Sequence, residues 1–329
     1  MSKNSEMKLQ RGYSKSVINS ISNKKPHIIG IIIFLLLSSC SGDRQESDTE
    51  SRKLNVVATT GMLYDAVLQV GDTLVDASPI MGPGVDPHLY KATQGDLKKL
   101  RNADLIIYNG LLLEGKMGDI LDNLGRRKPV FAAGKVINKE RLLSSRQYEN
   151  AYDPHIWFDV SLWKEAVRGI SLKLQELDSV NSKLYQERTT NYLSTLDTLD
   201  RYVRSKIATI PAKQRVLVTA HDAFGYFGKA YDIEVQGLQG ISTVSDFGLK
   251  DIANLTDLII ERNVKAIFVE TSVSDKAIKA VINGCREKGH EVTVGGSLYS
   301  DAMGEFGTYE GTYVGMVNHN VDIITNSLK

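Results

Sequence analysis

The chain has little cysteine, no excess of charge of either sign, and no apolar run long enough to cross a membrane as a helix. Two cysteines among 329 residues leave little scope for disulfides, so a packed core must hold the fold together. Lysine and arginine number 40 against 39 acidic residues, which argues against the basic surface that nucleic-acid binding requires. We therefore expect an ordinary globular protein without a nucleic-acid partner.

The first 39 residues have the features of a secretory signal. Polar and basic residues precede an apolar run of about ten residues, 28–37, whereas a membrane-spanning helix needs roughly twenty. The run leads into Leu-Ser-Ser-Cys at residues 37–40, which resembles the lipobox of bacterial lipoproteins, where cleavage leaves a lipidated cysteine. We expect residues 1–39 to be a signal peptide and Cys40 to anchor the protein to a bacterial membrane, in the periplasm or at the cell surface. An uncleaved anchor or a misplaced start site is the alternative.

The mature chain is long enough for two domains. Residues 40–53, charged and rich in serine, read as a flexible stalk. About 290 residues follow the lipobox, which suits two domains of typical size. Cys285 has no second thiol or motif histidine near it in the sequence, so we expect it to be a buried apolar residue.

Three of the six histidines lie in distinctive local sequences. His88 ends Gly-Val-Asp-Pro-His, His155 lies in Tyr-Asp-Pro-His-Ile-Trp, and His221 lies in Thr-Ala-His-Asp-Ala-Phe. Imidazole is the commonest protein ligand for zinc and related ions, so these motifs predict a transition-metal site. Simpler explanations exist, because a proline before a histidine also fixes a turn without any metal, and His221 could mark the entry to a helix.

Apolar runs and periodic segments alternate along the chain. Four runs rich in β-branched residues predict buried parallel strands, at 54–58, 105–108, 216–219 and 266–269. Helical patterns occur at 63–70, 95–102, 250–262 and 275–288. This alternation is typical of doubly wound α/β domains, in which ligands sit beyond the carboxyl ends of the strands. His221 follows the third predicted strand by two residues, which is such a position.

One long helix is predicted between the two halves. Residues 172–207 contain no glycine or proline, and apolar residues recur at intervals of three, four and seven, the pattern of one helical stripe. Pro211 follows the expected end. We therefore expect a lobe at 54–171, a linking helix at 172–210 and a second lobe at 211–329. A helix of about 25 residues would be nearly 40 Å long and would limit hinge closure.

Four segments together resemble the metal-binding segments of the zinc/manganese solute-binding proteins of ABC importers. In order along the chain they are Met-Gly-Pro-Gly-Val-Asp-Pro-His (81–88), Asp-Pro-His-Ile-Trp (153–157), Thr-Ala-His-Asp-Ala-Phe-Gly-Tyr-Phe (219–227) and Tyr-Ser-Asp-Ala-Met-Gly (299–304). The similarity extends from about residue 54 to the carboxyl end. The resemblance implies two α/β lobes joined by one rigid helix, with one metal ion in the cleft. It also implies the ligands, His88 and His155 from the first lobe and His221 and Asp301 from the second.

This ligand set has its own chemical preference. Three imidazoles and one carboxylate suit Zn²⁺ and are compatible with Mn²⁺ or Fe²⁺, and no thiolate favours softer ions. Three histidines favour zinc, because manganese prefers harder oxygen ligands. Resembling proteins with this set are nevertheless associated with both ions, so we expect Zn²⁺ with Mn²⁺ as the alternative. Asp301 is the least secure ligand, since Ser300-Asp301 could simply cap the next helix.

Other polar and aromatic residues around the motifs receive supporting roles. Glu270, directly after a predicted strand, is a competing carboxylate that we expect to support the site or the fold rather than bind metal. Four aspartates could orient the histidine rings, namely Asp86, Asp153, Asp159 and Asp222. We expect four aromatic residues to pack around the site or in the core, namely Trp157, Phe224, Tyr226 and Phe227. The remaining histidines, which we do not expect to be ligands, are His27, His290 and His319.

The leading functional hypothesis is capture of Zn²⁺ or Mn²⁺ outside the cytoplasmic membrane and delivery to an ABC importer permease. We expect a monomer with no enzymatic activity. A zinc-dependent hydrolase is the first alternative, although the sequence has no His-Glu-x-x-His pair and Asp301 would close the coordination shell. A surface adhesin is the second, because adhesive surfaces have no reliable sequence motif.

Overall fold

The first half of the chain is built on a four-stranded parallel sheet. The computed structural model describes residues 52–145, 148–244 and 247–329. The strands are β1 (Leu54–Ala58), β2 (Val75–Pro79), β3 (Leu105–Tyr108) and β4 (Val130–Ala132), in the spatial order β2-β1-β3-β4. Val57 of β1 lies opposite Ser78 on one side and Ile106 on the other. The two central strands are the ones that the sequence predicts in this half.

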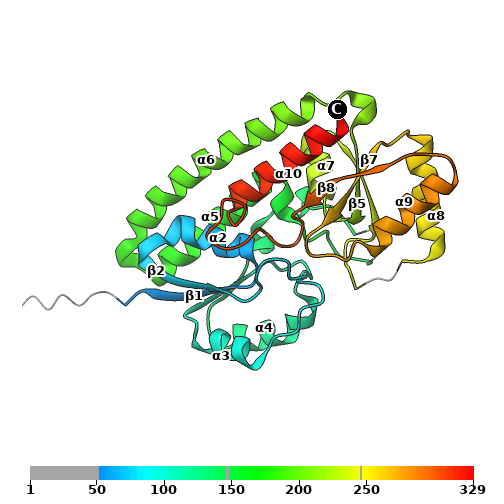
Figure 1. Cartoon of the computed structure of the whole chain (residues 1–329). Coiled ribbons are helices and arrows are strands. Elements are labelled where there is room, and N and C mark those ends of the chain that lie inside the picture. The colour runs from blue at the N-terminus through cyan, green and yellow to red at the C-terminus, as the bar shows by residue number, and fades with distance from the viewer. Residues whose placement is uncertain (1–51, 146–147, 245–246) are drawn as a thin grey trace, which may run out of the picture. The chain divides into compact units, whose positions relative to one another are not determined.

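The second half repeats the same strand order. Strand β5 (Val216–His221) pairs in parallel with β6 (Glu234–Gln239), and β7 (Ala266–Glu270) pairs in parallel with β8 (Thr293–Leu298). Strands β5 and β7 lie side by side, so the spatial order is β6-β5-β7-β8 (Figure 1). In each half the first and third strands are central, and the second and fourth are outside them. His221 is the last residue of β5 rather than two residues beyond the strand.

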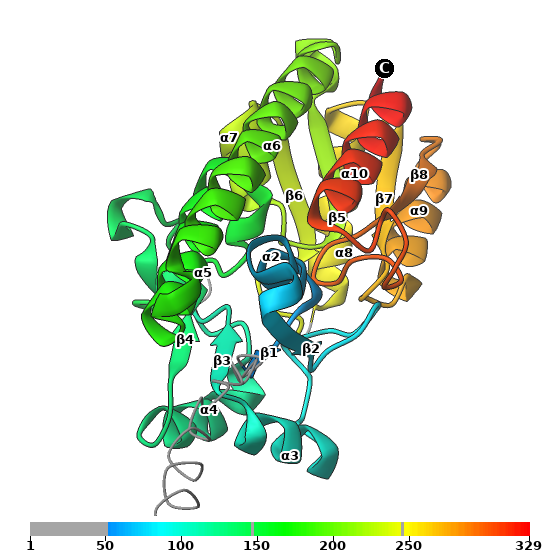
Figure 2. The same ribbon diagram turned by 90° about the vertical axis from the view of Figure 1, so that its left-hand side faces the viewer.

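Helices cover both sets of strands. In the first half they are α2 (Gly61–Gly71), α3 (Gln94–Asn102), α4 (Gly118–Gly125) and α5 (Val160–Leu177). In the second they are α7 (Gly225–Tyr231), α8 (Leu249–Glu261), α9 (Lys276–Glu287) and α10 (Tyr313–Leu328). Helix α2 packs on β1, β2 and α5, whereas α3 and α4 lie against β1 and β4. Helices α8 and α9 pack together, and α10 lies against β8 (Figures 1 and 2).

The other helical turns are short and of the 3-10 type. They are η1 (Asp72–Leu74), η2 (Gly115–Met117), η3 (Ala133–Val136), η4 (Lys139–Arg141), η5 (Ile156–Phe158), η6 (Ser179–Asn181) and η7 (Ala212–Gln214). In the part of the chain that the structure describes, no helix combines the length and apolar character needed to cross a membrane.

Helix α6 (Ser182–Ala208) connects the two halves. It packs on α2 and α5 of the first half and on α7 and α10 of the second (Figure 2). Its 27 residues correspond to about 40 Å at the rise of an α-helix. The predicted apolar stripe forms its buried face, which comprises Tyr185, Thr189, Tyr192, Leu196, Leu199, Val203 and Ile207. The predicted fold, two doubly wound α/β lobes joined by a long helix, is confirmed.

The beginning of this helix differs from the prediction. The sequence predicts one helix from residue 172, but residues 172–177 complete α5, and α6 starts at Ser182. The chain leaves the helical path at Asp178, whose carboxylate accepts hydrogen bonds from the Asn181 backbone and side chain and from the Tyr185 hydroxyl. An aspartate that bonds to nearby backbone competes with helix formation, which explains the break.

Residues 53–329 form one compact unit. The lobe limits at residues 171 and 211 stay predictions. The signal peptide at 1–39 and Cys40 lie outside the described residues, as does nearly all of the stalk at 40–53.

Candidate metal centre

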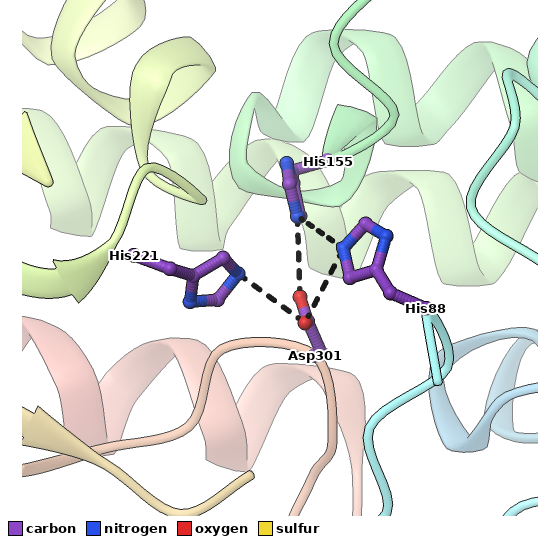
Figure 3. A group of neighbouring side chains, drawn as sticks. All are labelled: His88, His155, His221 and Asp301. Carbon is purple, nitrogen blue, oxygen red and sulfur yellow. Dashed lines mark hydrogen bonds and ion pairs between the residues drawn. The ribbon is translucent and has the colours of Figure 1, made fainter. Parts of the chain in front are cut away.

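Four side chains from distant segments meet in one buried cluster (Figure 3). His88 comes from the loop between β2 and α3, and His155 directly precedes η5. His221 ends β5, and Asp301 lies between β8 and α10. One potential ligand atom of each residue lies within 4.8 Å of all the others, and all four residues are buried. The structure therefore brings together all four residues of the predicted ligand set.

The spacing of these atoms suits a small cation. The Nε2 atoms of His155 and His221 lie 3.3 and 3.2 Å from the two oxygens of Asp301, Oδ1 and Oδ2 respectively. His88 Nε2 lies 3.6 Å from Asp301 Oδ2 and 3.4 Å from His155 Nε2. Ligands at the usual zinc distance of 2.0–2.1 Å in a tetrahedron are separated by roughly 3.3 Å. The observed separations are those of donor atoms that share one ion.

The buried oxygens of Asp301 also need a cation. Within residues 52–329, as far as they are described, neither oxygen receives a hydrogen bond of good geometry. Both oxygens instead face imidazole nitrogens. Because a buried charged group without compensation is costly, such a carboxylate needs positive charge beside it. A metal ion among the four side chains, or protons on the histidines, would supply that charge.

Two further carboxylates lie behind the rings of His155 and His221. Asp153 Oδ1 lies 2.7 Å from His155 Nδ1, and Glu270 Oε2 lies 2.5 Å from His221 Nδ1. An acceptor at Nδ1 fixes the proton there and leaves Nε2 free to bind metal. The roles predicted for Asp153 as an orienting group and for Glu270 as a supporting residue are confirmed.

The two Asp-Pro-His motifs share a backbone feature. In each, the aspartate accepts a hydrogen bond from the backbone N–H of the histidine two residues later, at 2.8 Å from His88 to Asp86 and 2.9 Å from His155 to Asp153. Aspartate commonly makes such a turn with its own backbone. The repeated tripeptide is therefore a device that presents a histidine from a fixed turn.

The other three candidate aspartates do not orient imidazole rings. The second oxygen of Asp86 accepts a hydrogen bond from the Thr243 hydroxyl at 2.5 Å. Asp159 caps helix α5 through the backbone N–H of Ser161. Asp222 is not the partner of its neighbour His221, because Glu270 and Asp301 face the two ring nitrogens. The sequence offered no way to choose among these aspartates, since the choice depends on how the loops fold.

The carboxylates have opposite effects on the pKa values of the histidines and of Asp301. Burial lowers the pKa of His155, but the charges and hydrogen bonds of Asp153 and Asp301 outweigh it and raise the pKa to about 9. Burial is likewise outweighed at His221, where Glu270 and Asp301 raise the pKa. Burial dominates at His88 and lowers its pKa to about 3. Burial would raise the pKa of Asp301, but the histidines, His221 first, lower it.

The remaining aromatic and histidine residues behave as expected. Tyr226 donates its hydroxyl hydrogen to the Asp153 carbonyl, and Phe224 packs on Phe158 with ring centroids 4.3 Å apart. Trp157 and Phe227 are buried in the core. The rings of His290 and His319 face backbone carbonyls of Val264 and Ser297 instead of the cluster. Cys285 is buried as a free thiol, and His27 lies outside the described residues.

A buried carboxylate that the sequence did not reveal closes the equivalent point of the first sheet. Glu114 accepts hydrogen bonds from the Thr59 hydroxyl at 2.6 Å and from the backbone N–H groups of Asn109 and Gly110. The Asn109 amide in turn donates to the Pro154 carbonyl, directly before His155. The chain fills this crevice with its own side chain, and that side chain supports a ligand-bearing loop.

An apolar cavity leads to one of the four residues. It has a volume of about 290 Å³, and His88 is in its lining together with Leu111, Leu112, Tyr152 and Ile241. Leu111 and Leu112 have φ values of 54° and 69°, in the left-handed region that costs energy for residues with a side chain. His88 is thus the member of the cluster that borders an open space.

Comparison with known proteins adds independent information. The family model described as zinc-uptake complex component A, periplasmic (ZnuA), matches residues 56–327, which include all four clustered side chains. The chain is 48% identical over 293 residues to the manganese-binding lipoprotein MntA of Bacillus subtilis (strain 168), covering 89% of this chain and 95% of that protein. It is also 48% identical over 273 residues to the zinc-binding protein TroA of Treponema pallidum (strain Nichols), covering 83% and 88%. The solved structure of the periplasmic zinc-binding protein TroA from Treponema pallidum matches with a TM-score of 0.82 at 47% identity, over 84% of this chain and 99% of that one.

Proposed function

The chain belongs to the family of the periplasmic zinc-uptake complex component A, and we propose that it captures a divalent transition-metal ion outside the cytoplasm and delivers it to an ABC importer. The ion is cargo, bound and released without chemical conversion. The hydrolase and adhesin alternatives gain no support from the relatives described above, whose names concern metal binding.

One observation carries this proposal. Three imidazoles and one carboxylate, contributed by loops and strand ends from both halves of the chain, converge within 4.8 Å in a buried position. We propose that His88, His155, His221 and Asp301 are the ligands. Four segments so far apart in the sequence would have no reason to point their polar ends at one another in a dry interior unless a cation joined them.

The preferred ion is proposed to be Zn²⁺, with Mn²⁺ as the alternative. Three imidazoles to one carboxylate favour zinc over the harder manganese ion. Two relatives of equal identity are nevertheless named for different metals. Asp153 and Glu270 contribute to this question, because with Asp301 they place three buried carboxylates against a divalent ion. If all three are ionised, the loaded site carries one net negative charge, which offsets the attraction lost by using neutral imidazoles.

The location of the protein is proposed from its N-terminal sequence. A lipobox ending at Cys40 would attach the chain to a bacterial membrane on its outer side, and the relative from Bacillus subtilis is named a lipoprotein. The permease of the importer is the proposed partner, and the protein is proposed to meet it as a monomer.

Metal analysis of purified protein tests the function. After a chelator has removed bound metal, protein reloaded with Zn²⁺ or Mn²⁺ should retain one ion per chain, and His88→Ala and His221→Ala should lose it. His290→Ala is a matched control, because its ring bonds to the Val264 carbonyl outside the cluster. The proposal fails if reloaded wild-type protein binds no more metal than His221→Ala. Direct competition between Zn²⁺ and Mn²⁺ then identifies the preferred ion.

A further inference from the structure

Trp157 connects the segments that carry two of the four clustered side chains. It lies two residues after His155, and its indole N–H donates a hydrogen bond to the Ser300 carbonyl at 3.0 Å. Ser300 directly precedes Asp301 in the sequence. Trp157 and Ser300 are both buried, so water does not compete for this hydrogen bond. One side chain therefore joins a turn of the first half to a loop of the second.

The same tryptophan also packs against the imidazole. The ring centroids of Trp157 and His155 lie 5.3 Å apart, at an interplanar angle of 73°. This edge-to-face contact restricts the orientation of the imidazole ring, while Asp153 holds its Nδ1. His155 is thus held from two directions before any third partner approaches its Nε2.

Tyr313 holds the backbone of Trp157 in place. Its hydroxyl donates to the Trp157 carbonyl at 2.7 Å, and its own backbone N–H, in the first turn of α10, donates to Asp65 of α2 at 3.1 Å. The ring of Trp163 stacks on Tyr313 with centroids 5.1 Å apart. These buried contacts tie α2, η5 and α10 together around the tryptophan.

We infer that Trp157 is a positioning residue that fixes His155 and Asp301 relative to each other, so that an incoming ion meets a preassembled pair of ligands. This inference rests on the proposed function. The hydrogen bond joins backbone and indole atoms, none of which is a metal ligand, so it can exist with or without the ion. The observed 3.3 Å between His155 Nε2 and Asp301 Oδ1 is then maintained by the protein. Preorganised ligands bind more tightly because less ordering is needed when the ion arrives.

The test compares two tryptophan substitutions. Trp157→Phe keeps an aromatic ring but removes the N–H that reaches Ser300, and Trp163→Phe removes a buried indole that stacks on Tyr313 instead. The readouts are Zn²⁺ affinity by chelator competition, the Zn²⁺ dissociation rate, and the visible absorption spectrum of the Co²⁺-loaded protein, which reports ligand geometry directly. Thermal unfolding of the metal-free variants shows how much each change affects the fold itself.

Trp157→Phe should lower Zn²⁺ affinity by about tenfold or more, the range found when groups behind metal ligands are removed, and should change the Co²⁺ spectrum. Trp163→Phe should leave affinity and spectrum close to those of the wild type even if it lowers the melting temperature. Tyr313→Phe, which removes only the hydroxyl bonded to Trp157, provides a milder variant and should weaken binding in the same direction. It keeps the test valid if Trp157→Phe does not fold.

Two results would overturn the inference. One is that Trp157→Phe, or Tyr313→Phe if the former does not fold, binds metal like the wild type with an unchanged Co²⁺ spectrum. The other is that Trp163→Phe causes an equal loss of affinity, since this would indicate a general effect of core disruption. Failure of wild-type protein to bind a stoichiometric ion is a separate outcome and would defeat the proposed function itself.

Discussion

Glu270 holds His221 at two points. Its Oε1 accepts the backbone N–H of His221 at 2.9 Å, and its Oε2 lies 2.5 Å from the ring Nδ1. Glu270 ends strand β7 and His221 ends the adjacent strand β5, so the contact spans the centre of the second half. This pairing leads to the first prediction.

Glu270→Gln should weaken metal binding by about 10–100-fold, the usual effect of removing a carboxylate behind a metal-binding histidine. The new amide would donate a hydrogen to Nδ1, which forces the ring proton onto Nε2, the atom that faces Asp301. Chelator competition with Zn²⁺ measures the effect. Glu234→Gln, which alters a more exposed ion pair with Arg262, is the control, and equal affinities of the two variants would contradict the prediction.

Metal binding should release two protons per ion near neutral pH. The raised pKa values of His155, about 9, and of His221 mean that both rings carry an extra proton in the metal-free protein, whereas the pKa of about 3 at His88 means that its ring is already neutral. Ligand nitrogens must be unprotonated, so affinity should fall as pH falls, by about two logarithmic units per pH unit between roughly pH 6 and 8. Titration in weak buffer counts the protons. Release of none, or of three, would show that this protonation pattern is wrong.

Bound metal should stabilise the fold by mass action. At a free ion concentration 100 times the Kd, the free energy of unfolding rises by about 2.7 kcal/mol, which corresponds to roughly 5–10 °C in melting temperature for a chain of this size. A chelator should remove the increase. His155→Ala should show little or no increase at the same ion concentration, and a shift equal to that of the wild type would indicate metal bound somewhere else.

The linking helix should be sensitive to substitutions on one face only. Leu196 of α6 is fully buried, so Leu196→Ala should reduce the free energy of unfolding by about 2–5 kcal/mol through lost burial and a cavity. Leu184 lies in the same helix with its surface 43% exposed, and Leu184→Ala should have a much smaller effect. Chemical denaturation of the metal-free proteins measures both. Similar losses would contradict the buried stripe described for this helix.

The sequence predicts the central strands and misses the outer ones for a physical reason. Strands β1, β3, β5 and β7 have neighbours on both sides, and their continuous apolar runs are visible without a structure. Strand β2 has the sequence Val-Asp-Ala-Ser-Pro, and β8 contains two adjacent glycines. Such outer strands are partly exposed and need no apolar run, so only the position of the partner strand reveals them.

The same distinction applies to the site. The four clustered residues could be predicted because their motifs are local and resemble known segments. Their supporting contacts depend on long-range folding, as the hydrogen bond from Trp157 to Ser300 shows, since 143 residues separate the two in sequence. Thr243 beside Asp86 and Glu114 beside Thr59 are further examples that no local pattern indicates.

The repeated strand order gives the molecule two crevices of the same topological kind, one where β1 and β3 diverge and one where β5 and β7 diverge. At the first, the carboxylate of Glu114 is fully occupied by groups of its own chain. At the second, Glu270 turns toward His221 and leaves the far side of the imidazole open to a guest. The architecture is therefore symmetrical in its wiring and asymmetrical in its use, so that one half serves as a sealed platform while the other receives the traveller.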